Sequence, residues 1–245
     1  MKNKVICVVH GEYSRTGRVG ATIQSLGYEE VRCCHRLGDP LPERFDDIAG
    51  VCVFGGPMSA NDDTTMPFIA DELAWIEKVL AAEVPYFGIC LGGQMLARVL
   101  GATVKPNDEG WHEIGFHEIA PTGCGREVFG DITHVYQWHG EGFELPGEAT
   151  LLATGVTGHF PNQAFRYGEI SYGVQFHPEC TRDIIEWWMT SASEKLSSPG
   201  AHGPEQQIAG ARAHDHKVDA WVRSFLADWF AAGGTALPLA RAAAV

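Results

Sequence analysis

The chain has 245 residues and a mass of 26.7 kDa, which suits one large α/β domain and exceeds a mini-protein held by disulfides alone. Hydrophobic residues make up 45% and charged residues 20%, so extended disorder is excluded over most of the chain. The net charge of −13, from 18 basic and 31 acidic residues, argues against a nucleic-acid partner.

No run approaches the roughly 18 apolar residues of a membrane span, and no secretory signal opens the chain. Seven cysteines without regular spacing are typical of reduced thiols. We therefore expect a cytoplasmic protein with no membrane partner.

The first half of the chain alternates short apolar runs with helical patterns, which predicts a largely parallel sheet with right-handed crossovers. The predicted strands are 4–9, 30–34, 51–54 and 84–89, and the predicted helices are 18–26, about 69–80, and 92–100.

The second half changes character and ends in helices. Its predicted strands are 111–119, 135–138, 150–154, 163–166 and 171–176, and its helices are 181–196 and 206–230. The second helix carries an apolar stripe that predicts core contact, with a partner-binding face as the alternative: Val218, Trp221, Val222, Phe225, Leu226 and Trp229.

We therefore predict an α/β fold with a mostly parallel central sheet flanked by helices. A single domain is expected over 1–245, with a core of about 4–180 and a C-terminal helical extension of about 181–232. The Ala-rich segment 233–245 is expected to fray.

One cysteine stands apart from the other six. Cys90 lies between Gly88 and Gly92, where a predicted buried strand meets a predicted helix, in the pattern of a nucleophile elbow. The sharp turn leaves no room for side chains at the two glycines, and the start of a helix favours a thiolate. The alternative is a buried cysteine in an ordinary tight turn.

A histidine and a glutamate follow the last predicted strand. His177 and Glu179 are two residues apart, so in extended chain their side chains point to the same side. A carboxylate in that place can hold an imidazole in one tautomer and orient it toward a thiol. His-x-Glu alone is a weak signal, and the elbow strengthens it.

A glycine pair ends another predicted strand. Gly55 and Gly56 precede Pro57 at the carboxyl edge of the sheet, where open α/β sheets bind ligands. A backbone N–H at this turn and the N–H of Leu91 could together stabilise an oxyanion. An ordinary Gly-Pro turn is the alternative.

These three motifs, in this order and spacing, resemble the class I glutamine amidotransferases. The resemblance covers roughly 4–180 and is strongest to stand-alone proteins similar to the amidotransferase domain of GMP synthetase. It implies the flavodoxin-like architecture of that family and a triad of Cys90 as nucleophile, His177 as base and then acid, and Glu179 as orienter. It also implies an oxyanion hole formed by the backbone N–H groups of Gly56 and Leu91.

The resemblance also points to residues around a glutamyl pocket. Gln94 matches a position that contacts the glutamyl moiety, and the segment containing Gln137, Trp138 and His139 resembles one that lines the pocket. Trp138 stands where synthetase-type members often have serine, so the pocket could accept a different glutamyl compound.

Neither a cofactor nor a metal is expected. The spacings of His112 with His117 and of His214 with His216 match no known zinc site.

The leading hypothesis is hydrolysis of the γ-amide of glutamine, or of a γ-glutamyl amide or peptide, through a thioester on Cys90. One alternative is a glutaminase subunit that passes ammonia to a separate synthetase partner, and another is a non-catalytic binding module. Cysteine peptidases with this elbow commonly place a histidine after the nucleophile, where this chain has Leu91. An α/β hydrolase would place its acid before its histidine, and here His177 comes first.

Overall fold

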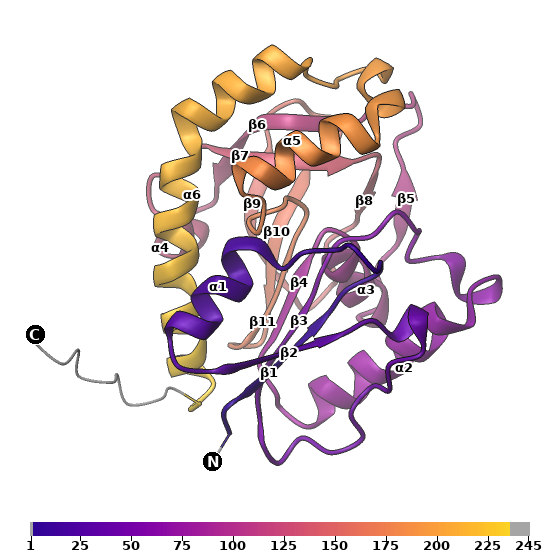
Figure 1. Ribbon diagram of the computed structural model, residues 1–245, viewed down its shortest axis with the longest axis vertical. Coiled ribbons are helices and arrows are strands. Elements are labelled where there is room, and N and C mark those ends of the chain that lie inside the picture. Colours follow the sequence, from indigo (N-terminus) through magenta and orange to yellow (C-terminus); the bar gives the residue numbers. More distant parts are fainter. Residues whose placement is uncertain (1, 236–245) are drawn as a thin grey trace, which may run out of the picture.

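The computed structural model describes residues 2–235 and has a mixed nine-stranded sheet between helices (Figure 1). The predicted segment 233–245 lies mostly outside these residues. The strand order is β2-β1-β3-β4-β11-β10-β9-β6-β7.

Five neighbouring strands of the sheet run parallel. They are β2 (Glu29–Cys33), β1 (Lys4–Val8), β3 (Ile48–Val53), β4 (Tyr86–Ile89) and β11 (Ser171–Val174). The next four are antiparallel to their neighbours: β10 (Asn162–Tyr167), β9 (Thr150–Gly155), β6 (Glu113–Pro121) and β7 (His134–His139). The parallel part comes from the alternating half of the sequence plus β11, which returns to the centre of the sheet beside β4.

Helices cover both faces of the sheet. They are α1 (Gly17–Ser25), α2 (Pro67–Ala81), α3 (Leu91–Val99), α4 (Gly125–Phe129), α5 (Arg182–Ser191) and α6 (Pro204–Ala232). Two short strands, β5 (Val104–Pro106) and β8 (Glu141–Phe143), form a separate pair, and 3-10 turns occupy His35–Leu37, Asp62–Thr64 and Ser193–Ser197. Sequence patterns missed β5 and β8 because three residues are too few to show a period.

The two faces of β1 show why the sheet is buried on both sides. Val5 and Cys7 belong to the apolar cluster that also contains α1 and α6 residues, whereas Ile6 and Val8 belong to the cluster with α2 and α3. Successive side chains of a strand point to opposite faces, so an uninterrupted apolar run fits a strand with helices on both sides.

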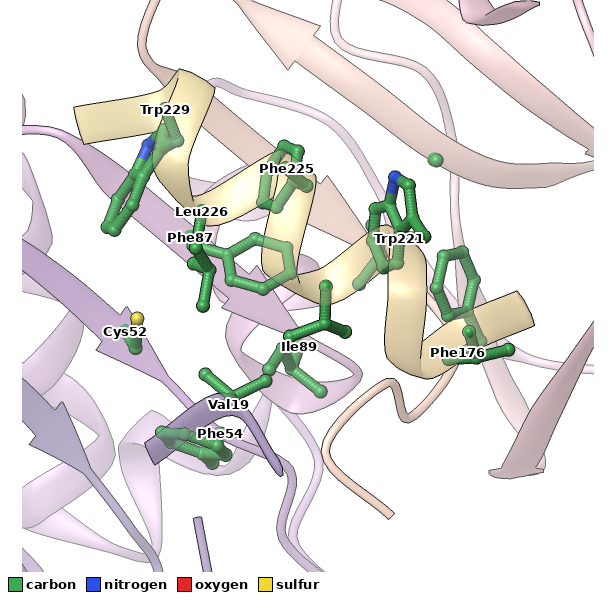
Figure 2. Packing of buried hydrophobic residues seen from close by; sticks show 14 of the residues in the cluster. Val19, Cys52, Phe54, Phe87, Ile89, Phe176, Trp221, Phe225, Leu226 and Trp229 are labelled. Carbon is green, nitrogen blue, oxygen red and sulfur yellow. The ribbon is translucent and has the colours of Figure 1, made fainter. Parts of the chain in front are cut away.

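The apolar stripe of α6 packs on the sheet, as predicted (Figure 2). The ring of Phe225 lies 4.9 Å from that of Phe87 on β4, and Trp229 donates a hydrogen bond to the Ile170 carbonyl. Gly50 on β3 makes room for this helix, because a Cβ there would come within 2.7 Å of Trp229. The long C-terminal helix is therefore part of the core cluster.

The helix α5 covers the far end of the sheet, over β6 and β7 (Figure 1). Ile184 and Ile185 pack against Phe116 and Tyr136, which brings the tryptophans of α5 near the ends of the central strands. None of the helices within 2–235 combines the length and the apolar character that a bilayer span requires.

Stacked histidines join α6 and the segment just before it to β6 and β7. The rings of His117 and His202 are 4.3 Å apart, and those of His134 and His214 are 4.0 Å apart. Burial lowers the pKa of His117 to about 4, with a further lowering from His202 and an opposing effect of Glu113. Burial and His134 also lower the pKa of His202.

We expect these histidines to make the protein acid-labile. A histidine with a lowered pKa binds fewer protons in the folded state, so its contribution to stability is complete above pH 6.5 and is lost as the pH falls toward 4. For His117 the loss is on the order of 3 kcal/mol. The free energy of unfolding, measured by urea titration at pH 7, 5.5 and 4.5, should fall less in His117→Gln than in the wild type. Parallel pH dependence in the two proteins would contradict this role.

Candidate active site

Four adjacent parallel strands deliver polar groups to one edge of the sheet. His10 follows β1, Gly55 follows β3, Cys90 follows β4, and His177 follows β11. Because the strand order is β1-β3-β4-β11, their carboxyl ends are neighbours and these residues converge. The carboxyl edge of a parallel sheet is the usual ligand site of such folds.

Cys90 occupies a strained turn between β4 and α3. Its φ of 50° and ψ of −106° lie in a backbone region that residues other than glycine rarely adopt. A Cβ at Gly88 would lie 2.4 Å from the Gly92 carbonyl oxygen, and one at Gly92 would lie 2.0 Å from that of Val53. Both glycines of the motif are therefore sterically required, and they hold Cys90 at the start of α3.

His177 and Glu179 form a buried pair. Nδ1 of His177 lies 2.8 Å from Oε1 of Glu179, and both side chains are 4% exposed. The strand β11 ends at Val174, so the two residues lie in the turn that follows it. The predicted contact is present, although turn geometry brings it about where we expected extended chain. The indole of Trp188 on α5 packs edge-on against the imidazole at 4.8 Å.

The opposite nitrogen of His177, Nε2, makes no hydrogen bond of ordinary geometry within the described chain. Burial alone would lower the pKa of His177, but Glu179 and Cys90 outweigh it and raise the pKa above its usual value. Gly55 brings the groups together, since a Cβ there would lie 2.6 Å from the His177 ring and 3.6 Å from Cβ of Cys90. The arrangement favours an imidazolium beside the sulfur of Cys90.

Two backbone N–H groups beside Cys90 are unengaged. Neither Gly56 nor Leu91 donates its N–H to an acceptor within residues 2–235. Leu91 is the first residue of α3, and the N–H groups in the first turn of a helix have no hydrogen-bond partner inside the helix. Free donors next to a nucleophile can bind an oxyanion.

The buried amide side chains of Gln175 and Gln94 lie next to Cys90. Nε2 of Gln175 approaches the Cys90 sulfur at 3.7 Å, and Nε2 of Gln94 lies 3.3 Å from Oε1 of Gln175 and 3.0 Å from the Glu141 carbonyl oxygen. Nδ1 of His139 contacts that same carbonyl oxygen at 3.0 Å. Gln94 and His139 are thus linked through the backbone of Glu141.

The side chain of Gln137 points into a second polar network. It donates to Gln163 at 2.6 Å, and Gln163 donates to Glu113 at 2.8 Å. Nε2 of His139 lies 3.2 Å from Glu113 and, against the effect of burial, this contact lowers the pKa of Glu113. Of the residues predicted to bind substrate, only Trp138 borders the Cys90 cavity, whereas Gln94, Gln137 and His139 are buried outside its lining.

Cys90 borders a cavity of about 470 Å³. Aromatic side chains form much of its wall, and they come from the loop after β1, from β7 and from α5: Tyr13, Trp138, Trp187 and Trp188. Arg36, Lys195 and Glu12 add charge to the same wall. A space of this size accepts a group much larger than ammonia.

Burial does not separate Cys90 from the other cysteines. Within the described chain none forms a disulfide, and all but Cys124 are buried. Burial raises the pKa of the Cys180 thiol, with a further rise from Glu179. His177, Glu179 and Cys180 are also the one group of three potential metal ligands found in residues 2–235. Two of its members already bond to each other.

Sequence patterns missed several participants of this edge. His10 and Glu72 form a buried pair beside Gly55, and Trp187 borders the cavity. His10 directly follows an apolar strand at the edge that carries the other site residues, and this position alone could have indicated that it belongs to the site. Glu72 had none, because it lies within the apolar pattern of α2.

The family model of glutamine amidotransferase class-I matches residues 25–184. Among curated proteins, the glutamine amidotransferase-like protein YfeJ of Salmonella typhimurium is 28% identical over 222 residues, which cover 87% of this chain and 91% of that protein. The GMP synthase of Bacillus pumilus is 34% identical over 135 residues, 53% of this chain. The chain spans only about a quarter of that synthase, 24% of its length.

Solved structures agree with this assignment. A glutamine amidotransferase of Thermotoga maritima superposes with a TM-score of 0.84 at 28% identity, covering 94% of this chain and 99% of that one. A glutamine amido transferase of Methylobacillus flagellatus gives the same TM-score at 24% identity over 100% of this chain and 99% of that one, which supports the fold. The flavodoxin-like α/β architecture predicted from the motifs is confirmed, and the chain belongs to the class I glutamine amidotransferase family.

Proposed function

We propose that this protein hydrolyses the γ-amide bond of γ-glutamyl compounds through a thioester on Cys90. The observation that carries the proposal is the convergence of Cys90, the His177–Glu179 pair and two free N–H groups at one sheet edge. These are the parts that acyl transfer by a cysteine requires.

In the proposed reaction, the Cys90 sulfur attacks the γ-carbonyl carbon, and the negative charge that develops on the carbonyl oxygen is stabilised by the N–H groups of Gly56 and Leu91. His177 gives its proton to the nitrogen of the leaving group, and the C–N bond breaks to release ammonia or an amine. A water molecule, deprotonated by His177, then attacks the thioester carbonyl. The thioester bond then breaks, glutamate leaves, and the starting pair of Cys90 thiolate and protonated His177 is restored.

The residues of the glutamyl pocket have separate parts in the proposal. Gln94 and His139 do not border the cavity, and in the proposal they support the glutamyl site indirectly, by holding the backbone of Glu141 from two sides. Trp138 lies on the cavity wall, with its ring centroid 5.6 Å from that of Trp188, and we assign it to the leaving-group side. Gln137 supports the site from behind through Gln163.

The cavity wall favours a leaving amine larger than ammonia. Tyr13 and Trp187 are 72% and 40% exposed at its rim, so an apolar amine could bury aromatic surface there. Arg36 and Lys195 offer cations for a carboxylate of the same amine. A γ-glutamyl amino acid or peptide with an apolar side chain fits both features.

Replacement of Cys90 tests the nucleophile. Cys90→Ala and Cys90→Gly should both lower turnover of a γ-glutamyl amide by at least about 10⁴-fold, because the thioester cannot form. The two variants should differ in stability, since only glycine tolerates the positive φ at this position. Chemical denaturation should show Cys90→Gly to be more stable than Cys90→Ala by about 1 kcal/mol or more. Residual turnover near the wild-type rate in either variant would remove Cys90 from the mechanism.

Replacement of Glu179 tests the orienting carboxylate. Glu179→Gln keeps an acceptor for Nδ1 but removes the charge that raises the pKa of His177. The alkaline limb of the kcat/KM profile reports loss of the proton that His177 gives to the leaving group, so it should move to lower pH by about one unit or more. We also expect kcat to fall by about 10²–10⁴-fold. An unchanged alkaline limb would mean that another group is the acid.

The leaving group can be identified with a substrate series. We expect kcat/KM to rise from glutamine to γ-glutamyl phenethylamide and again to γ-glutamyl phenylalanine, which adds a carboxylate. Trp187→Ala should cost about tenfold on the aromatic substrates and little on glutamine, because only they reach the indole.

The same assay separates the alternative of a glutaminase subunit, which the similarity to part of GMP synthases favours. The result that glutamine is the best substrate and that turnover requires a synthetase partner would support the glutaminase-subunit alternative. A protein that binds glutamyl compounds without turning any of them over would instead be a binding module.

A further inference from the structure

His10 is held at both ends of its ring in the interior of the protein. Its Nδ1 lies 3.1 Å from the carbonyl oxygen of Gly55, and its Nε2 lies 2.9 Å from Oε2 of Glu72 on α2. Both side chains are about 1% exposed or less. Neither residue belongs to the nucleophile, the base or the oxyanion donors described above.

The chemistry of the partners fixes the direction of the first contact. A carbonyl oxygen can only accept a hydrogen bond, so Nδ1 must carry the proton that faces Gly55. The carboxyl group of Glu72 then holds Nε2 from the opposite side. The imidazole therefore cannot rotate away from Gly55 without breaking a second buried contact.

The Gly55 carbonyl shares a peptide group with the N–H of Gly56. No cis peptide occurs in the described chain, so this carbonyl and this N–H point in opposite directions. The hydrogen bond from His10 anchors the carbonyl, and the N–H of Gly56 consequently faces away from His10. That N–H has no acceptor within residues 2–235, and Gly56 borders the cavity that Cys90 also borders.

A peptide between two glycines needs such an anchor. With no Cβ on either side, the group can rotate with little steric cost, and a rotated peptide would direct the Gly55 oxygen toward the site. Side chains cannot replace the glycines, because a Cβ at Gly55 would lie 2.6 Å from the His177 ring. The absence of a side chain at Gly55 makes room for the His177 ring, and it also leaves the Gly55–Gly56 peptide free to rotate.

Stability alone gives no good reason for this pair. Taking a carboxyl group and an imidazole out of water is costly, and such pairs add little net stability. The second oxygen of Glu72, Oε1, is buried and has no hydrogen-bond partner among the described residues. A pair with an unsatisfied atom next to a reactive cysteine fits a functional constraint better.

We propose that His10 and Glu72 are positioning residues, which keep the Gly55–Gly56 peptide turned so that the oxyanion hole is formed before substrate arrives. This inference rests on the proposed function, since the oxyanion arises in that reaction. It adds that the hole is preformed and names the side chains responsible.

Kinetics of matched variants provide the first test. His10→Phe removes the hydrogen bond to Gly55 and should lower kcat on a γ-glutamyl amide by about 10²–10³-fold, the usual effect of losing one oxyanion donor. KM should change little, because the donor acts mainly in the transition state. Glu72→Gln retains a hydrogen-bonding partner for Nε2 and should fold like the wild type, with a smaller loss of kcat.

A rescue variant distinguishes positioning from bulk packing. Asparagine at position 10 can place an amide N–H where Nδ1 stands. In the Glu72→Gln background, His10→Asn should therefore recover most of the kcat that His10→Phe loses in the same background. His117→Gln is the control for loss of a buried histidine and should leave kcat unchanged, since His117 lies away from the cavity.

Crystal structures of His10→Phe and of His10→Asn/Glu72→Gln provide a second test that needs no activity. We expect the Gly55–Gly56 peptide to be rotated in the first and native in the second. The inference is overturned if the peptide keeps its orientation in His10→Phe, or if kcat of that variant is unchanged on a substrate that the wild type hydrolyses. If the wild type hydrolyses no γ-glutamyl amide, the proposed function fails, and the peptide orientations still decide the role of His10.

Discussion

Cys90 holds a backbone conformation that costs free energy, and the surrounding sheet and helix must enforce it. Its amide donates to the Val174 carbonyl of β11, and its own carbonyl accepts from the Gln94 amide in the first turn of α3. Gly88 and Gly92 allow β3, β4 and α3 to approach within contact of one another around it. The sharp turn presents Cys90 at the end of β4, beside the cavity, and the other groups of the site lie around it.

The strand order explains how residues so far apart in sequence reach this one turn. The chain inserts β11 beside β4 after a long excursion through β6 to β10. That insertion brings His177 and Glu179 next to Cys90, 87 positions away in the numbering for His177. Because all the contributing strands are parallel, every one of them presents its carboxyl end at the same edge. Thus the topology, more than any local motif, assembles the proposed site.

Motifs predicted the elbow, the His177–Glu179 contact and most strands, because each depends on residues close together in sequence. The uninterrupted apolar run of β1 and the helical spacing of the α6 stripe can also be recognised within one short stretch of sequence. The position of β11 at the centre of the mixed sheet could not be predicted from local patterns. The sequence of a strand does not show which distant strand it pairs with. Glu72 is the clearest case, because a glutamate on an amphipathic helix normally faces solvent and here it is 1% exposed.

The two sides of the site have different physical characters, and this difference bears on selectivity. On the Cys90 side, the N–H groups of Gly56 and Leu91 are unengaged among the described residues, and the buried amides of Gln94 and Gln175 bond to one another behind Cys90. A bound acyl group would therefore meet donors in fixed positions. A site of buried polar groups discriminates strongly, because a wrong ligand leaves them unpaired.

On the other side, the rim residues Tyr13 and Trp187 are exposed and aromatic, and apolar contact of that kind discriminates weakly between similar ligands. The rigid side would thus demand a glutamyl group while the open side would accept a range of amines. Under the proposed function, this asymmetry would suit a family of γ-glutamyl compounds as substrates, and a preformed oxyanion hole would serve all of them. With the Gly55–Gly56 peptide held by His10, catalysis would not have to wait for a particular leaving group to shape the site.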